Sequence, residues 1–178
     1  LLYNPRGVLS TVRDPQGRPT VIDLIRGKKQ RLFPVGRLDV DAEGLILLIS
    51  DGALAHRLIH PRFQVPRTYH VKVQGTPSEK AQKRLKQKIN IGRGEWASPP
   101  IDVSILRTTR SFNSWWKIVM IEGKNREVKR IFQALGHPVL KLKRMGFAFL
   151  NLKGLKPGDY RALDPKEVQR LYEIGKIS

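Results

Sequence analysis

The sequence contains no cysteine and few acidic residues, and several absences exclude whole classes of protein. Without cysteine there are no disulfides, no thiolate metal sites and no cysteine nucleophile. No stretch approaches the ~20 apolar residues that span a bilayer, and the first ten residues lack the apolar run of a signal peptide. There is no GxGxxG or Walker-type loop, so we expect no nucleotide cofactor. A cytoplasmic protein is the simplest interpretation.

The charge of the chain is strongly one-sided. Lys and Arg number 34 against 15 Asp and Glu, which gives a net charge of +19 and a pI near 10.8. Clustered cations bind phosphate and release its counterions, so the predicted partner is a polyanion. An anionic membrane surface is the other candidate partner.

The pattern of apolar residues predicts an α+β protein with a mixed, largely antiparallel central sheet flanked by helices. The run LILLI predicts a buried strand, and RTYHVKVQ alternates as a half-buried strand does. Further strands are expected at 32–37, 101–108, 115–121, 138–142 and 148–152. Helices are expected at 20–25, 51–59, 78–87, 126–136 and 164–172. No linker or repeat divides the chain, so we expect one domain over residues 1–178, with room for two subdomains.

The stretch GRLDVDAEGL concentrates acid in a basic chain. Its Asp39, Asp41 and Glu43 begin like a calcium-binding loop, but the twelfth position is Ser50 instead of a bidentate Glu, and the preceding residues do not form a helical pattern. Asp39 stands on a loop that enters a buried strand, which would hold a nucleophilic carboxylate rigidly. The alternative is that Asp39 only caps or turns the loop.

Three other features have both a functional and a structural interpretation. His56 and His60 have a metal-like spacing, but no third ligand lies nearby, so a hydrogen bond at a helix end is favoured over a metal site. The segment EGKNREVKRIF presents cations at a helix start, where backbone N–H groups also attract phosphate. The alternative there is a solvated basic face. Tyr69 is either a core residue or a platform on which a base stacks.

Taken together, these stretches resemble the RsuA/RluB-type pseudouridine synthases of ribosomal RNA. The resemblance is carried by four ordered motifs that cover nearly the whole chain: GRLDVDAEGLILLISDGALAHRLIHPR, RTYHVKVQG, EGKNREVKRIFQALGHPVLKLKR and LKGLKPGDYRAL. It implies the catalytic fold of that family, with the active-site cleft across the sheet. It also implies an isomerase that converts a specific uridine to pseudouridine without cofactor or metal, after turning the base out into a pocket.

The resemblance assigns roles to single residues. Asp39 takes the position of the catalytic aspartate, for which attack on the sugar, attack on the ring and a glycal route are alternatives. Tyr69 takes the position of the tyrosine that stacks on the flipped uracil, and Lys129 that of the basic residue paired with the aspartate. Arg37 would fill the gap left by the base, and Leu142 would form the apolar wall of the uracil pocket. The remaining cations expected to bind RNA are Lys124, Arg126, Arg130 and Arg144.

The sequence departs from the family pattern at three places. Ala42 stands where the family usually has Thr or Ser, and YNPRG lacks the usual Lys before Pro5. The small N-terminal α-L RNA-binding domain of most relatives is expected to be absent from this chain. We expect a monomer acting on ribosomal RNA, with the large subunit favoured. The competing hypotheses are a non-catalytic RNA-binding or ribosome-assembly module that kept the fold and a basic protein of membrane surfaces.

Overall fold

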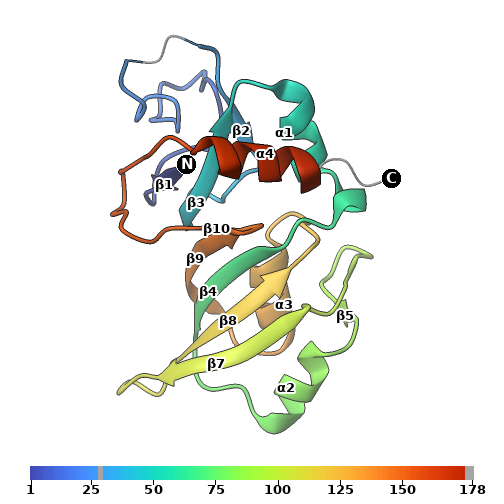
Figure 1. Ribbon diagram of the computed structural model, residues 1–178. Coiled ribbons are helices and arrows are strands. Elements are labelled where there is room, and N and C mark those ends of the chain that lie inside the picture. Colours follow the sequence, from blue (N-terminus) through green and yellow to red (C-terminus); the bar gives the residue numbers. More distant parts are fainter. Residues whose placement is uncertain (28–29, 175–178) are drawn as a thin grey trace. The chain divides into compact units, whose positions relative to one another are not determined.

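The computed structural model describes residues 1–27 and 30–174, which form two compact units (Figure 1). Unit 1 comprises residues 1–65 and 145 onwards, and unit 2 comprises residues 66–144. Strand β9 (Val139–Phe147) contributes residues to both. The strand pairs described below are all antiparallel, and four α-helices accompany them in the described residues. The predicted α+β class with a largely antiparallel sheet is therefore confirmed.

Unit 1 is built around β3 (Glu43–Ile49), which is apolar on both faces. Strands β1 (Leu2–Asn4) and β2 (Phe33–Val35) pair with it, with Leu2 opposite Ile46 and Val35 opposite Leu47. Leu45 and Leu47 enter one apolar cluster, whereas Ile46 enters a second cluster on the other face. A strand covered on both sides reads as a continuous apolar run, which explains LILLI.

The helices of unit 1 begin where side chains can accept the first backbone N–H groups. Asp51 caps α1 (Gly52–Ile59) by accepting from Ala53 and Leu54, and Tyr172 of α4 (Pro165–Ile174) donates to the same carboxylate at 2.8 Å. Asp164 and Glu167 form a reciprocal capping pair at the start of α4. The short turn η1 (Pro61–Phe63) follows α1, and β10 (Leu150–Asn151) pairs with the end of β9.

Unit 2 contains the strand order β9-β4-β8-β7. Strand β4 (Arg67–Val73) pairs with β8 (Ser114–Met120) along its whole length, and β8 pairs with β7 (Asp102–Thr108). The short strands β5 (Ile89–Asn90) and β6 (Trp96–Ala97) form a separate hairpin. Ser78 caps α2 (Glu79–Leu85) as its position in the sequence predicts.

The helix α3 (Glu127–Ala134) begins at a strained residue and ends at a glycine. Arg126 precedes it with φ +50, a left-handed conformation that a residue with a Cβ seldom adopts. Gly136 follows it with φ +80, and the His137 N–H bonds back to the Phe132 carbonyl at 2.9 Å. This is the glycine-dependent helix ending that removes the penalty of a positive φ.

One predicted helix is wrong, and two predicted strands have other bounds. Residues 20–25 form turns instead of a helix: the Asp23 N–H bonds the Thr20 carbonyl at 3.1 Å and the Ile25 N–H bonds the Ile22 carbonyl at 3.2 Å, each three residues back. The Asp23 carboxylate accepts the backbone N–H and the hydroxyl of Thr20 at 2.8 Å, as at a helix start, but the chain turns at Gly27, whose φ is +64. The two strands predicted at 138–142 and 148–152 are instead the nine-residue β9 and the short β10, with Ala148 at φ +52 in the turn between them.

Candidate functional site

Asp39 lies on a loop of unit 1 that buried contacts hold in place. The hydroxyl of buried Ser10 accepts the N–H of Leu38 at 3.0 Å and lies 3.4 Å from its carbonyl. On the other side, the Ala42 N–H donates to the Asp39 carbonyl at 2.9 Å and closes a tight turn. Leu38 and Ala42 are buried, whereas Asp39 is half-buried. Its carboxylate is therefore carried by a fixed backbone between two anchored neighbours.

The sequence around Asp39 explains this placement. Gly36 ends β2 with φ +76, a turn that suits glycine, and Gly44 has φ +132 inside β3. The Gly7 N–H donates to the Val40 carbonyl at 2.7 Å and ties the loop to the N-terminal segment. Arg37, the residue expected to fill the gap left by a flipped base, is exposed on the same loop. The arrangement presents one cation and one carboxylate on a supported turn.

The other acidic residues of the stretch have different surroundings. Asp41 is exposed, and the Tyr3 hydroxyl donates to the Glu43 carboxylate at 3.4 Å. Asp41 is thus more exposed than Asp39, and Glu43 belongs to β3, with Tyr3 as a hydrogen-bond donor.

Tyr69 lies on β4 of unit 2, opposite Ile118 of β8, between two buried arginines. Arg67 and Arg144 are only 8% and 2% exposed. Burial lowers the pKa of each guanidinium, and the neighbouring Tyr69 opposes that shift, for Arg144 through a side-chain hydrogen bond as well. The side-chain hydrogen bond with Arg144 and the pairing of β4 with β8 hold the phenol in orientation.

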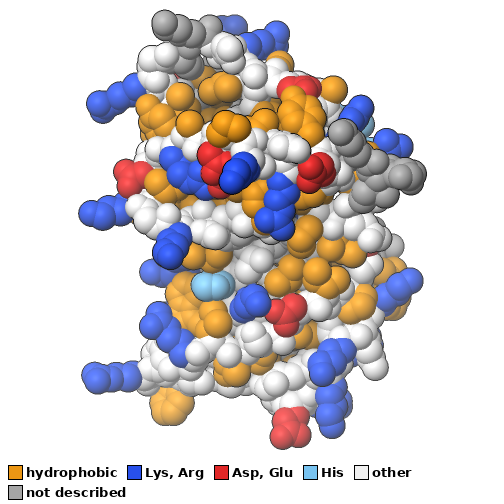
Figure 2. All heavy atoms as spheres, viewed as in Figure 1, with side chains coloured by type: hydrophobic (Ala, Val, Ile, Leu, Met, Phe, Trp, Pro, Cys, Tyr) orange, Lys and Arg blue, Asp and Glu red, His pale blue; other side chains and the backbone are white. Residues whose placement is uncertain are grey.

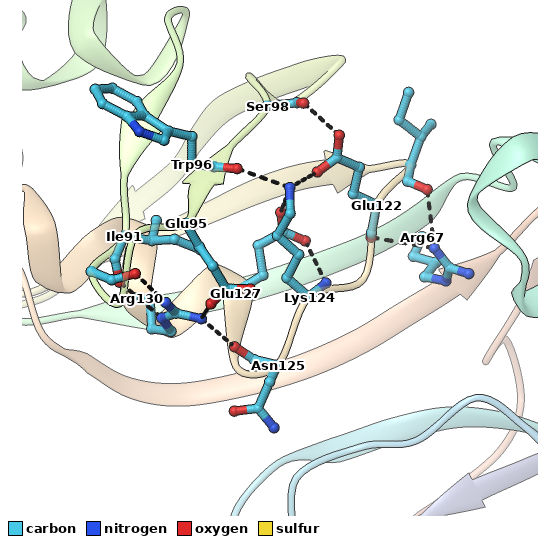
Figure 3. A network of polar contacts seen from close by, with 12 residues as sticks. Arg67, Ile91, Glu95, Trp96, Ser98, Glu122, Lys124, Asn125, Glu127 and Arg130 are labelled. Carbon is cyan, nitrogen blue, oxygen red and sulfur yellow. Dashed lines mark hydrogen bonds and ion pairs between the residues drawn. The ribbon is translucent and has the colours of Figure 1, made fainter.

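Arg67 also supports the loop that leads into α3. Its guanidinium donates to the carbonyls of Ile121 and Glu122 at 3.2 and 3.3 Å (Figure 3). The same loop carries the motif EGKNR. Strand β4 therefore both carries Tyr69 and, through Arg67, holds the loop at residues 122–126 in place. Arg144, which we predicted to bind RNA, lies beside Tyr69 inside unit 2; its role toward RNA stays a prediction.

A polar network organises the loop at residues 122–127 (Figure 3). The Lys124 ammonium donates to the Glu122 carboxylate and, at 2.9 Å, to the Trp96 carbonyl. The hydroxyl of Ser98 donates to the other oxygen of Glu122. The Lys124 N–H donates to buried Glu127 at 3.1 Å. One lysine thus connects the loop, the start of α3 and the hairpin.

The charges of this network shift one another's pKa. Lys124 and Ser98 lower the pKa of Glu122 by hydrogen bonding, and Glu122 in return raises the pKa of Lys124. Burial is the main cause that raises the pKa of Glu127, and the neighbouring Glu122 adds to it. Two carboxylates whose pKa values shift in opposite directions therefore flank one lysine.

The remaining predicted residues of unit 2 divide into supported and exposed groups. Arg130 donates from Nε and a terminal nitrogen to the carbonyls of Ile91 and Gly92, and it pairs with Glu95 at 2.6 Å. Arg126 is exposed, and Lys129 is half-buried on α3. Leu142 is 8% exposed on β9, and its place in a uracil pocket stays a prediction.

Sequence patterns missed the supporting residues Ser10, Arg67, Glu122 and Glu127. Arg67 and Glu127 lie inside the quoted motifs, so proximity to Tyr69 and Lys124 in sequence was the available signal. Their burial was not readable, because Arg and Glu are ordinarily exposed. Ser10 carried no signal, since it acts on Leu38 across 28 positions of chain.

Two other sequence features have structural roles in unit 1. The His60 ring accepts the Arg62 N–H at 3.3 Å, which is the helix-end role favoured above. In residues 1–27 and 30–174, no three His, Asp or Glu side chains gather as potential metal ligands. Within the same ranges, none of the helices is long and apolar enough to cross a membrane. Lys and Arg side chains are spread over the visible surface of both units (Figure 2).

The comparisons with known proteins agree with the resemblance in the motifs. The sequence model of the family described as RNA pseudouridylate synthase matches residues 2–134. The chain is 44% identical over 172 residues to ribosomal large subunit pseudouridine synthase B of Bacillus subtilis, covering 96% of this chain and 70% of that protein. It is 39% identical to the protein of the same name from Yersinia pestis, covering 98% of this chain and 55% of the relative.

A solved structure described as a pseudouridylate synthase aligns with a TM-score of 0.82 and 29% sequence identity. The alignment covers 96% of this chain and 71% of the chain in that structure. The chain thus spans between about half and seven-tenths of the proteins named here. The family model covers well over half of the chain, and it includes the Asp39 loop, β4 and the whole of α3. This chain belongs to the RNA pseudouridylate synthase family.

Proposed function

We propose that this chain converts a uridine of large-subunit ribosomal RNA to pseudouridine. The observation that carries the proposal is the anchored loop of Asp39, which presents a half-buried carboxylate between buried Leu38 and Ala42 in a chain of net charge +19. A carboxylate repels a polyanion, so Asp39 does not help the chain to bind RNA. Because its loop is nevertheless held rigidly, we infer that the carboxylate takes part in the reaction. The names of the relatives from Bacillus subtilis and Yersinia pestis support the choice of RNA.

The reaction breaks the bond between C1′ of ribose and N1 of uracil and forms a bond from C1′ to C5. N1 gains a hydrogen and C5 loses one, so the reaction is an isomerisation without change of oxidation state. For this reason we propose that it needs no redox cofactor, and the family resemblance implies that it needs no metal. Asp39 supplies the carboxylate that engages the flipped nucleoside, and covalent engagement would hold the two fragments during reorientation.

Each remaining residue takes a role that suits its surroundings. Tyr69 stacks on the flipped uracil and is oriented by Arg67 and Arg144. By the resemblance, Lys129 takes the role of the family's basic residue, Leu142 that of the apolar wall of the uracil pocket, and Arg37 that of the arginine that fills the space vacated in the RNA. Exposed Arg126 binds the RNA backbone.

The proposal extends to organisation and place of action. We propose that residues 1–178 act as one catalytic domain made of both units, as a monomer in the cytoplasm, where ribosomal RNA is available. A non-catalytic RNA-binding module is the outcome that would replace this proposal. It differs from the enzyme in having no use for the support given to Asp39.

Pseudouridine mapping tests the proposal. Ribosomal RNA of both subunits is incubated with the wild-type chain, with Asp39→Asn and with the matched control Asp41→Asn, whose carboxylate is exposed on the same loop. We expect one new pseudouridine in large-subunit RNA with wild type and Asp41→Asn, and none with Asp39→Asn. Modification by Asp39→Asn, or RNA binding by all three without modification, would contradict it.

A further inference from the structure

Trp96 is an exposed aromatic residue that the predicted site did not include. It lies on β6 of the hairpin next to the loop at residues 122–127, and 52% of it is exposed. A single exposed hydrophobic residue is ordinary on a protein surface. The position of Trp96 differs in that its backbone is fixed from two sides by residues of the basic segment that the proposed function assigns to RNA.

The first attachment runs through Lys124. Its ammonium donates to the Trp96 carbonyl at 2.9 Å and also to the Glu122 carboxylate (Figure 3). Glu122 in turn accepts a hydrogen bond from the hydroxyl of Ser98, two residues after Trp96. The indole points away from this network (Figure 3). The Lys124 ammonium therefore holds the strand that carries Trp96 in place. The aromatic ring itself is exposed to solvent and can contact a ligand.

The second attachment runs through Arg130 of α3. Its guanidinium donates to the Ile91 carbonyl at 2.9 Å and to the Gly92 carbonyl at 2.8 Å, and it pairs with Glu95 at 2.6 Å. These partners lie on both sides of the hairpin turn. The hairpin is thus bound to the helix that carries Lys129 and follows Arg126. An aromatic ring on a preorganised support loses little conformational entropy when it binds a ligand.

The exposed cations on the hairpin and at the start of α3 favour a nucleic acid as the ligand of Trp96. Arg93, at the hairpin turn with φ +58, and Arg126, at the start of α3, are exposed cations on the two elements that the attachments join. An exposed indole accompanied by arginines is the combination on which unpaired bases stack while their phosphates are neutralised. The flat face of a base also needs no particular hydrogen-bond pattern.

We propose that Trp96 stacks on an unpaired base near the target uridine, and that Lys124 and Arg130 are positioning residues for it. The proposal rests on the proposed function for the identity of the RNA. Lys124 and Arg130 were predicted to bind RNA; under this proposal their cationic groups hold the hairpin instead. The contact with RNA is made by Trp96 and by exposed Arg93 and Arg126.

Tryptophan fluorescence and kinetics together test the stacking. The variants are Trp96→Ala, the conservative Trp96→Phe, and the control Phe112→Ala, which removes an aromatic ring that is 82% exposed elsewhere in unit 2. The probe is an RNA stem-loop that contains the mapped uridine and its unpaired neighbours. We expect Trp96→Ala to raise the KM about 5- to 150-fold at unchanged kcat, Trp96→Phe to recover most of it, and Phe112→Ala to match wild type.

The fluorescence readout is independent of catalysis. The chain has three tryptophans, of which Trp116 is buried and Trp115 half-buried. RNA binding should quench the wild-type signal and leave Trp96→Phe nearly unquenched. Equal quenching in both proteins, or equal KM values for Trp96→Ala and wild type, would overturn the stacking. If no uridine is mapped, the same fluorescence titration is made with whole large-subunit ribosomal RNA: quenching of wild type but not of Trp96→Phe would then support the stacking although the proposed function has failed.

The positioning role has a separate readout in the salt dependence of RNA binding. Lys124→Met and Glu122→Gln both loosen the attachment, but only the first removes a cation. We expect both to weaken binding by a similar factor with an unchanged slope of log K against log salt. A slope reduced by about 0.7 in Lys124→Met alone, with normal binding by Glu122→Gln, would instead make Lys124 a direct phosphate contact and overturn its positioning role.

Discussion

Replacing Ser10 by alanine should damage the Asp39 loop without touching any group that reacts. The Ser10 hydroxyl accepts the buried Leu38 N–H at 3.0 Å, and the residue itself is 6% exposed. In Ser10→Ala, that N–H loses its partner inside the fold. An unsatisfied buried donor costs about 1–3 kcal/mol, and each kcal/mol lowers the Tm of a domain of this size by about 2–4 °C.

The same substitution should affect catalysis through position. Leu38 directly precedes Asp39, so a shift of the Leu38 backbone displaces the carboxylate. A displacement on the order of 1 Å costs about 100-fold in rate in a well-oriented site, and partial relaxation brings the expected loss in kcat to roughly 10- to 100-fold. The Kd for RNA should stay near the wild-type value, because the cations of the surface are unchanged.

Thermal unfolding, RNA binding and single-turnover kinetics are the assays for this prediction. The matched control is Thr11→Ala, which removes the neighbouring hydroxyl and its exposed bond to the Arg13 carbonyl at 3.1 Å. We expect the control to keep wild-type Tm and kcat. If Ser10→Ala keeps both as well, the buried contact does not position the loop and the reasoning is refuted.

Two further substitutions test the network and the core. Burial raises the pKa of Glu127 above its usual 4.5, so the stability that this residue contributes falls as the pH rises from about 4.5 through the folded pKa. Glu127→Gln should flatten this part of a curve of Tm against pH. An unchanged curve would contradict the raised pKa of Glu127. Leu47→Ala empties a position of β3 that is 1% exposed and should lower the free energy of unfolding by about 2–5 kcal/mol. Urea denaturation measures this loss, and a change below 1 kcal/mol would show that β3 is not the centre of the unit 1 core.

The sequence predicted the elements whose cause is local. The run LILLI anticipated β3 because burial on both faces leaves no polar alternation, and the caps Ser78 and Asp164 were readable because a helix start needs an acceptor for its first N–H groups. The helix predicted at 20–25 failed because a Thr-x-x-Asp start resembles a helix start, whereas the backbone bonds there join residues three apart and the chain turns at Gly27. The strand predicted at 138–142 was too short because β9 continues through Arg144, which is buried although arginine is ordinarily exposed.

The candidate site was predictable to the extent that its motifs are contiguous. The family and its isomerase chemistry follow from motif order, and the comparisons confirm the family. The roles of Asp39, Tyr69 and Lys129 stay predictions. Contacts between distant residues could not be read: Ser10 with Leu38, Arg67 with Glu122, and Arg130 with Gly92 are separated by 28, 55 and 38 positions. They determine which cations support the fold and which face solvent.

Release of the uracil C5 hydrogen tests the central claim most directly. Formation of the bond from C1′ to C5 expels that hydrogen, so large-subunit ribosomal RNA made with uridine tritiated at C5 should release tritium to water when the wild-type chain acts on it. We predict release of one equivalent per RNA by wild type and by Asp41→Asn, and none by Asp39→Asn. Release by Asp39→Asn, or RNA bound by wild type with no tritium released, would contradict an isomerase that acts through Asp39.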